Sequence, residues 1–325
     1  MPRIFVKNEL GTVQFSSGNF LAEICLPFLK SAQNADGGWG FRMGAESRVE
    51  PTAWTILALA GLDSQAEIVS GGLRFLRSTQ LPDGSWPASP GQTVGCWATS
   101  LACWALGHDS ESQTALTTGL QWICADWPKD LNFVQRLIRR IRSLAKREVV
   151  SQQDDSLRGW GWTPNTASWV EPTAFGLLAV DQAPKDLLPA GAGERQRLAK
   201  SMLYNRMCPG GGWNCGNPMV YGVAGDPSIP QTVWALLALR NEPSGEPQTS
   251  SLQWLGKSVT GAIGIGSLAL AKICLETYGR EFVNAENRFR ERYERNGFLG
   301  NVPAIAWTCL ALGGRSESWL KRGNT

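Results

Sequence analysis

The chain has little of what metal sites and nucleic-acid interfaces are built from. Its 325 residues include one histidine, His108, and no C-x-x-C pair, so a zinc site is not expected. Charged residues make up 18% of the chain, and the net charge is +3. A balance this small gives no basic excess for nucleic acid, while 43% hydrophobic residues exclude a disordered chain. We therefore expect no metal, no other cofactor and no nucleic-acid partner.

Long apolar runs are also missing. The first residues contain no stretch of signal-peptide length, and the most apolar later run, 261–275, is interrupted by Lys272 and several glycines. Four of the eight cysteines fall within apolar helical patterns: Cys96, Cys103, Cys274 and Cys309. Cys208 and Cys215 flank a glycine-rich turn, where a disulfide or a metal is the alternative to two ordinary thiols. These features predict a cytoplasmic protein.

Tryptophan and glycine, by contrast, are abundant, with 15 and 36 copies. A Gly/Trp turn at 159–162 is followed by Glu171 and by an apolar helix that starts at Pro172. The same order occurs earlier, where the turn 37–41 leads to Glu50 and Pro51. Two copies of so specific a string indicate an internal repeat, which fixes the fold before any other signal.

Amphipathic or polar helices alternate with apolar ones about six times along the chain. A helix that is apolar on all sides must be buried, and amphipathic partners can surround it. The pattern predicts an all-α (α/α)6 toroid with six inner and six outer helices, an open solenoid being the alternative. The inner helices are expected to start near Pro51, Thr93, Glu171, Pro230, Ser267 and Pro303, with their N-termini at one end.

The repeat turns resemble those of a known superfamily. Residues 33–39 and 80–86 both read Q-x-x-x-G-x-W, the repeat of squalene–hopene and related terpenoid cyclases, whose toroid is shared by prenyltransferase β subunits. The repeat residues are Gln33, Gly37, Trp39, Gln80, Gly84 and Trp86, with degenerate copies at Trp160/Trp162 and at Trp213. This resemblance covers nearly the whole chain and implies a squalene cyclase-like toroid of the terpenoid cyclase/prenyltransferase class.

The resemblance also implies a candidate acid. Class II terpenoid cyclases start their reaction with a D-x-D-D-T-A motif, and aligning it on Thr173 and Ala174 puts Glu171 at the proton donor's place. The flanking carboxylates are absent, because Trp169 and Pro172 replace them. Glu50 stands in the same position of the first repeat. The alternative for both glutamates is a helix start, in which a carboxylate precedes Pro-Thr.

Several tryptophans fall on the predicted inner helices and are candidates for lining a substrate cavity with their π faces. Together with Glu50 and Trp169, the substrate-binding candidates are Trp54, Trp97, Trp104, Trp234 and Trp307. Core packing is the alternative for each tryptophan. His108 ends an apolar helix and is expected at the surface, and the turn 210–212 is either a phosphate cradle or a degenerate repeat turn.

A basic segment, 131–157, interrupts the repeats. Its predicted helix has an apolar face and six cations: Arg136, Arg139, Arg140, Arg142, Lys146 and Arg147. Such a helix either faces solvent or docks peripherally on an anionic membrane surface. We treat the rest as one toroid domain over 1–325, with a short tail at 315–325.

Taken together, these features predict a protein that binds an isoprenoid or another apolar molecule in a central aromatic cavity. The activity implied by the resemblance is a protonation-started cyclase or isomerase. The alternative is a non-catalytic scaffold or lipid-binding protein that kept the toroid and lost the acid cluster. The sequence does not decide between them, nor does it give an oligomeric state.

Overall fold

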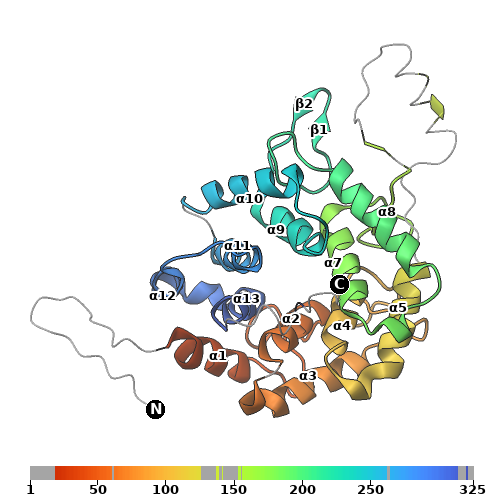
Figure 1. Ribbon diagram of the computed structural model, residues 1–325. Helices are drawn as coiled ribbons and strands as arrows, with labels where there is room; N and C mark the ends of the chain where they lie inside the picture. Colours follow the sequence, from red (N-terminus) through yellow and green to blue (C-terminus); the bar gives the residue numbers. More distant parts are fainter. Residues whose placement is uncertain are drawn as a thin grey trace, which may run out of the picture.

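The computed structural model describes residues 19–60, 62–125, 137–138, 141, 153–154, 156–261, 264–313 and 320. These residues form twelve α-helices and one two-stranded sheet. The helices alternate between an outer and an inner layer (Figure 1). Most of the basic segment 131–157 and of the tail 315–325 lies outside the described residues.

Six helices form the outer layer. They are α1 (Leu26–Ser31, preceded by a π-helical turn at Leu21–Cys25), α3 (Ala66–Ser78), α5 (Gln113–Ala125), α8 (Ala192–Asn205), α10 (Glu246–Ser258) and α12 (Ala285–Asn296). Five of them pack on the inner helix before or after them in the chain, while α1 packs on α13, the last inner helix. Pro27 sits in the first turn of α1, where its missing N–H costs no hydrogen bond.

The other six helices form the inner layer. They are α2 (Val49–Leu59), α4 (Ala98–Leu106), α7 (Val170–Gln182), α9 (Ile229–Ala238), α11 (Ile265–Thr277) and α13 (Val302–Leu312). Nearly every residue of α2 and α13 is buried, as expected of a helix that is apolar on all sides. Each inner helix packs on the next, and α13 packs back on α2. The ring is therefore closed, which confirms the predicted (α/α)6 toroid over the open solenoid.

The inner helices start at a common end of the ring. The N–H of Val302, the first residue of α13, donates to the carbonyl of Phe41 in the loop before α2 (3.0 Å). The N–H of Trp97, at the start of α4, donates to Trp162 in the loop before α7 (3.1 Å). Val170, at the start of α7, likewise donates to Cys215 in the loop before α9 (3.1 Å). We call this end of the toroid the mouth.

Each repeat turn is fastened to the helices on either side of it by its tryptophan. The Trp39 indole N–H donates to the Leu29 carbonyl of α1 (2.7 Å), while the Trp39 backbone N–H donates to the Thr52 hydroxyl of α2 (2.9 Å). The same pair of bonds recurs at the other turns, for Trp86 with Leu76 and Thr99, and for Trp213 with Leu203 and Thr232. Trp39, Trp86 and Trp213 are fully buried, so the turns close the gap between neighbouring helix pairs.

At the third turn the structure decides between the two tryptophans that the sequence offers. Trp160, not Trp162, makes the two repeat bonds, with the Ile123 carbonyl (2.9 Å) and the Thr173 hydroxyl (2.9 Å). Trp162 instead packs edge-on against Trp97, with 5.3 Å between ring centroids. The distance from Trp to the helix threonine identifies the right residue, because Trp39, Trp86 and Trp160 each precede their threonine by 13 residues.

Two helix starts also differ from the prediction. Helix α4 begins at Ala98 rather than Thr93, because the N–H of Cys96 pairs with the Trp86 carbonyl (3.1 Å) and ties the preceding residues to the repeat turn. Helix α10 begins at Glu246 although the residues before and after its start, 241–248, are rich in Pro, Gly and Glu and favour a surface loop, since Pro247 is compatible with a first turn. An unpredicted hairpin joins β1 (Met219–Val220) to β2 (Val223–Ala224), and Leu320 of the predicted tail is buried in the core.

Candidate functional site at the mouth of the toroid

The second residues of five inner helices lie at the mouth and form a layer of very unequal chemistry. In the sixth inner helix, α4, the second residue is Thr99, which is buried and accepts a hydrogen bond from the Trp86 backbone N–H. Glu50 and Glu171 occupy this position on α2 and α7. Pro230, Gly266 and Pro303 occupy it on α9, α11 and α13. Both carboxyl groups therefore gather on the α2–α7 side, while the other side is small and apolar.

Both glutamates are half-buried and titrate abnormally. Burial, together with the charge of Glu171, raises the pKa of Glu50 to about 7, against an opposing contribution from the Trp54 indole. Burial also raises the pKa of Glu171 from its ordinary value, and a hydrogen bond from Gln231 lowers it. That bond runs from Gln231 Nε2 on α9 to Glu171 Oε2 over 3.1 Å. The two carboxyl groups thus form an interacting pair.

One turn deeper, aromatic side chains fill the axis of the ring. Trp54 of α2 crosses it and stacks on Trp234 of α9, with 4.9 Å between ring centroids and 20° between ring planes. The rings of Trp104, Phe175 and Trp307 meet Trp54 edge-on at 5.7–5.8 Å. Trp54 and Trp104 are completely buried and Trp234 is 1% exposed. This aromatic layer is the floor beneath the glutamates, so these three rings pack together rather than line an open channel.

The remaining tryptophan candidates lie at the mouth itself. Trp97 caps α4 at its N-terminus, is half-buried and stacks on Phe175 at 5.9 Å. Trp169 is likewise the N-cap residue of α7, and its backbone N–H donates to the Trp160 carbonyl (3.0 Å). Both indoles therefore lie next to the helix starts that carry the site, and Trp97 joins the aromatic layer from above.

A hollow of about 570 Å³ opens at the mouth on the side away from the glutamates. It is lined by the starts of α9, α11 and α13, by the end of α12 and by Arg42. Trp307 lies in its wall, where Gly266 leaves room, since a Cβ at Gly266 would come within 3.1 Å of the indole. The hollow combines apolar residues with three guanidinium groups, from Arg42, Arg292 and Arg295. Its size is typical of a site for a small organic ligand.

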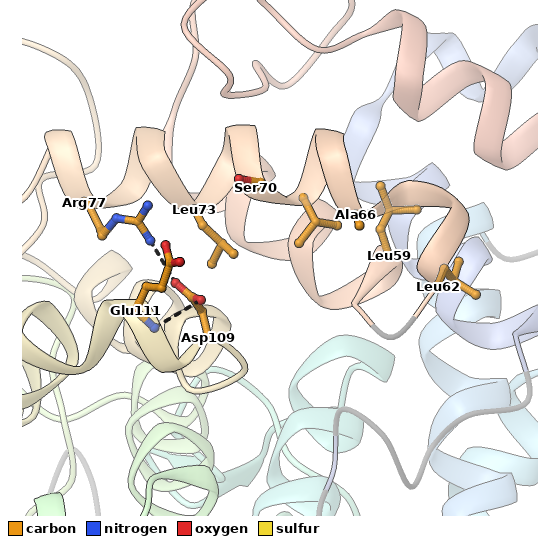
Figure 2. Close-up of a pocket in the computed structure, with 9 residues that line it drawn as sticks. Leu59, Leu62, Ala66, Ser70, Leu73, Arg77, Asp109 and Glu111 are labelled. Atoms are coloured by element: carbon orange, nitrogen blue, oxygen red, sulfur yellow. Dashed lines mark hydrogen bonds and ion pairs between the residues drawn. The ribbon is translucent and has the colours of Figure 1, made fainter.

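A second pocket, of about 280 Å³, lies at the opposite end of the ring (Figure 2). It is lined by the end of α2, by α3 and by the residues that follow α4. Its one cation is held in an ion pair, because Arg77 Nη1 lies 2.8 Å from Asp109 Oδ2. Remote from both glutamates, it has no place in the candidate site.

The other candidates from the sequence either lie away from the mouth or have the structural role that was given as their alternative. His108 follows the C-terminal end of α4. The turn 210–212 is a repeat turn, with Gly211 at φ +88°, as Gly37 and Gly84 are at +87° and +88°. Cys208 and Cys215 are free thiols. The described residues contain no cluster of three or more His, Cys, Asp or Glu able to hold a metal ion.

Sequence reasoning missed three contributors to the mouth: Gln231, Phe175 and Arg42. Two of them can be found by counting residues from the threonines that accept the backbone hydrogen bond of a repeat tryptophan. Phe175 follows Thr173 by two residues, as Trp54 follows Thr52 and Trp234 follows Thr232. Gln231 directly precedes Thr232, just as Pro51 precedes Thr52 and Pro172 precedes Thr173. Arg42 carries no comparable signal, because its position depends on the path of a loop.

Comparison with known proteins is consistent with this geometry. No model of a known protein family matches the chain. Human lanosterol synthase is 33% identical over 121 residues, which are 30% of this chain and 16% of the synthase. Drimenyl diphosphate synthase of Streptomyces showdoensis is 26% identical over 245 residues, 64% of this chain and 44% of the synthase. The chain thus spans less than half the length of either curated relative.

Among solved structures, a type II terpene cyclase from Scytonema in complex with merosterolic acid A superposes with a TM-score of 0.52 at 15% identity, covering 90% of this chain and 95% of that one. The chain is therefore similar to terpenoid cyclases in part of its sequence and shares their toroid fold. An α-1,6-mannanase of Salegentibacter superposes with a TM-score of 0.55 at 9% identity, covering 90% and 98%. The terpenoid cyclase fold is therefore shared with a glycoside-hydrolysing toroid, and the overall shape alone does not define the chemistry.

Proposed function

We propose that the chain binds an isoprenoid or similar apolar molecule at the mouth of the toroid and starts its cyclisation or isomerisation by protonation. The observation that supports this most is the pair Glu50 and Glu171. Two half-buried carboxyl groups with raised pKa values lie above an aromatic layer, and such an arrangement keeps an acid protonated near neutral pH.

The proposed chemistry balances without a cofactor. The carboxyl O–H bond breaks, its proton goes to one carbon of a C=C bond, and the π electron pair forms the new C–H bond. A carboxylate and a carbocation result, and the aromatic faces below stabilise the cation. Loss of a proton from the rearranged cation to a carboxylate restores the acid. The resemblance to the class II motif assigns the acid role to Glu171.

The hollow at the mouth supports a ligand with an apolar body and an anionic head. Leu270, Phe298 and Trp307 supply apolar contacts. Arg42 and Arg295 supply guanidinium groups that suit a diphosphate.

The protein should be incubated with squalene and with prenyl diphosphates of several lengths, and the products analysed by mass spectrometry. We expect product from the natural protein and none from a folded variant with both Glu50→Gln and Glu171→Gln; product from that variant would refute acid initiation by this pair.

A non-catalytic scaffold or lipid-binding protein is the second candidate, and one observation favours it. The stacked Trp54 and Trp234 occupy the axis, where a long substrate would otherwise pass. The same incubation separates the two functions. A ligand that co-purifies unchanged supports lipid binding, whereas recovery of neither ligand nor product supports a scaffold.

Peripheral contact with an anionic membrane is the partner that suits an apolar ligand. The six basic residues proposed for this membrane contact, between 136 and 147, lie outside the described residues. Within that range the structure describes only Leu137, Ile138 and Ile141, which are apolar and exposed. The neighbouring loops support the idea. Of the eleven large hydrophobic residues exposed in the described chain, all but Val283 lie in segments that lead from an outer helix to the next inner one. They are Phe41, Met43, Val94, Leu137, Ile138, Ile141, Val220, Tyr221, Val223 and Leu299. No helix in the described ranges is long and apolar enough to cross a bilayer.

Charge reversal at Arg139, Arg140 and Arg142 tests this contact. We expect weaker sedimentation with vesicles of anionic lipid at low salt, because the cations no longer attract the headgroups, and nearly unchanged thermal stability. Glu substitutions at Lys185 and Lys257, which belong to other segments of the chain, provide the control. Equal vesicle binding by the natural and charge-reversed proteins would exclude the basic segment as the membrane contact.

A further inference from the structure

We propose that Glu50, rather than Glu171, holds the transferable proton of the carboxyl pair, and that Glu171 is its ionised partner. This assignment goes against the position of the class II motif and follows from what each carboxyl group contacts. It depends on the proposed function only for the use made of the proton.

The Glu171 carboxylate has an oriented donor. Gln231 Nε2 lies 3.1 Å from Glu171 Oε2. The opposite end of the same amide, Gln231 Oε1, accepts a hydrogen bond from the Ser228 hydroxyl at the start of α9. This second bond fixes the amide so that its NH₂ group faces Glu171 rather than its oxygen. A donor held in this way stabilises the ionised form of the acid it faces.

Glu50 has no comparable donor in the described part of the chain. The indole of Trp54, one turn further along α2, acts on it, but the buried Trp54 Nε1 atom lacks full hydrogen-bond geometry to any acceptor. The other groups around it do not favour a charge. The Cys96 thiol lies before α4, and the equivalent positions on α9, α11 and α13 are Pro230, Gly266 and Pro303, which carry no cation. Burial therefore acts on Glu50 without a fixed donor comparable to Gln231 to oppose it.

The two carboxyl groups interact, so ionisation of one disfavours ionisation of the other. With Glu171 stabilised as the anion by Gln231, the remaining proton belongs on Glu50. The two groups then have different roles. Glu50 donates its proton to the substrate and becomes a carboxylate, while the Glu171 anion offsets the positive charge that develops above the aromatic layer. The pair therefore combines an acid and a counter-ion in residues 121 positions apart.

The proton can be located without any substrate. The protein would be labelled with ¹³C at the glutamate side-chain carboxyl carbons and followed by NMR from acid to alkaline pH. The variants are Glu50→Gln, Glu171→Gln and Gln231→Leu. Glu46→Gln is the matched control, since Glu46 precedes the same helix and its side chain is 65% exposed.

One glutamate signal should titrate near pH 7 in the natural protein and in the control. Glu50→Gln should remove it. Glu171→Gln should keep it but shift its midpoint downward, because the neighbouring negative charge is gone. Gln231→Leu should raise the midpoint of Glu171, because its donor is gone. Loss of the near-neutral signal in Glu171→Gln with retention in Glu50→Gln would overturn the assignment.

Gln231→Leu leaves both carboxyl groups in place, so it answers the question even if a glutamate variant fails to fold. An unchanged Glu171 midpoint in that variant would also overturn the assignment. If no substrate is ever turned over while the titrations behave as stated, the proposed function fails and the location of the proton stands. Full turnover by Glu50→Gln on a verified substrate would refute Glu50 as the donor.

Discussion

At the scale of single residues, identical sequence contexts acquire different chemistry from distant neighbours. Glu50 and Glu171 each precede Pro-Thr-Ala at a helix start, and the helix dipole favours ionisation of both. Only Glu171 receives the Gln231 amide, which is 60 residues away in the chain. The sequence predicts both glutamates and cannot rank them, because the ranking depends on a contact made through the closed ring.

The raised pKa of Glu50 predicts how stability depends on pH. The folded protein binds this proton up to about pH 7, whereas the unfolded chain releases it near the ordinary value of 4.5. The folded state therefore binds more protons between these limits, and stability should fall as pH rises through them, by at most about 3 kcal/mol. Urea denaturation of the natural protein and Glu50→Gln at pH 4.5, 6 and 8 checks this. The same dependence of the free energy of unfolding on pH in the two proteins would contradict this prediction.

Glycine in the repeat turn is a second residue-level constraint. Gly37 has φ +87°, and a Cβ there would come within 2.5 Å of the Gly71 carbonyl oxygen on α3. Gly44 has a similar φ of +75° but open space around it. Gly44→Ala should cost about 1 kcal/mol from backbone strain alone, and Gly37→Ala about 1–3 kcal/mol more, because α3 must move. Equal losses in a denaturation series would show that the close approach does not matter.

At the scale of elements, the repeat turn acts as a joint between an outer and an inner helix. Trp39→Ala and Trp160→Ala each empty a buried indole site and remove a hydrogen bond to a helix end, and each should cost about 3–5 kcal/mol. Trp162→Ala, two residues beyond the joint and half-buried, should cost less. Chemical denaturation of the three variants checks this. A larger loss of unfolding free energy for Trp162→Ala than for Trp160→Ala would mean that Trp162, and not Trp160, joins the two helices.

The helices themselves were predictable to differing degrees. Apolar stretches such as 51–62 can only be inner helices, since no face of them suits water, and the structure puts them there. The start of α4 was not predictable from periodicity, because the apolar residues before it are tied to the preceding turn by the bond from Cys96 to Trp86 and lie outside the helix. The aromatic floor was visible as separate tryptophans, but its packing depends on Trp54 and Trp234 lying opposite each other across the ring.

At the scale of the whole molecule, closure makes every inner helix depend on two inner neighbours. Helix α13 packs on both α11 and α2, so the last helix pair is also a neighbour of the first. Ending the chain before Ala285 should therefore expose α2 and α11 together and prevent stable folding. In an open solenoid, the same cut removes only a terminal unit. Circular dichroism and urea denaturation of the shortened protein check this, and a cooperative transition of near-natural midpoint would argue against a functionally closed ring.

The stacked pair on the axis also gives the molecule an optical signature. Two nearly parallel indoles 4.9 Å apart couple their electronic transitions, and Trp54 and Trp234 reach this geometry only when opposite halves of the chain are both in position. Coupled chromophores produce a paired positive and negative band in circular dichroism that isolated tryptophans lack. The contribution of this pair would report the joining of the two halves during refolding, separately from the helical signal. Trp234→Phe would remove that contribution, whereas the coupling of Trp54 with Trp104 and Trp307 would stay.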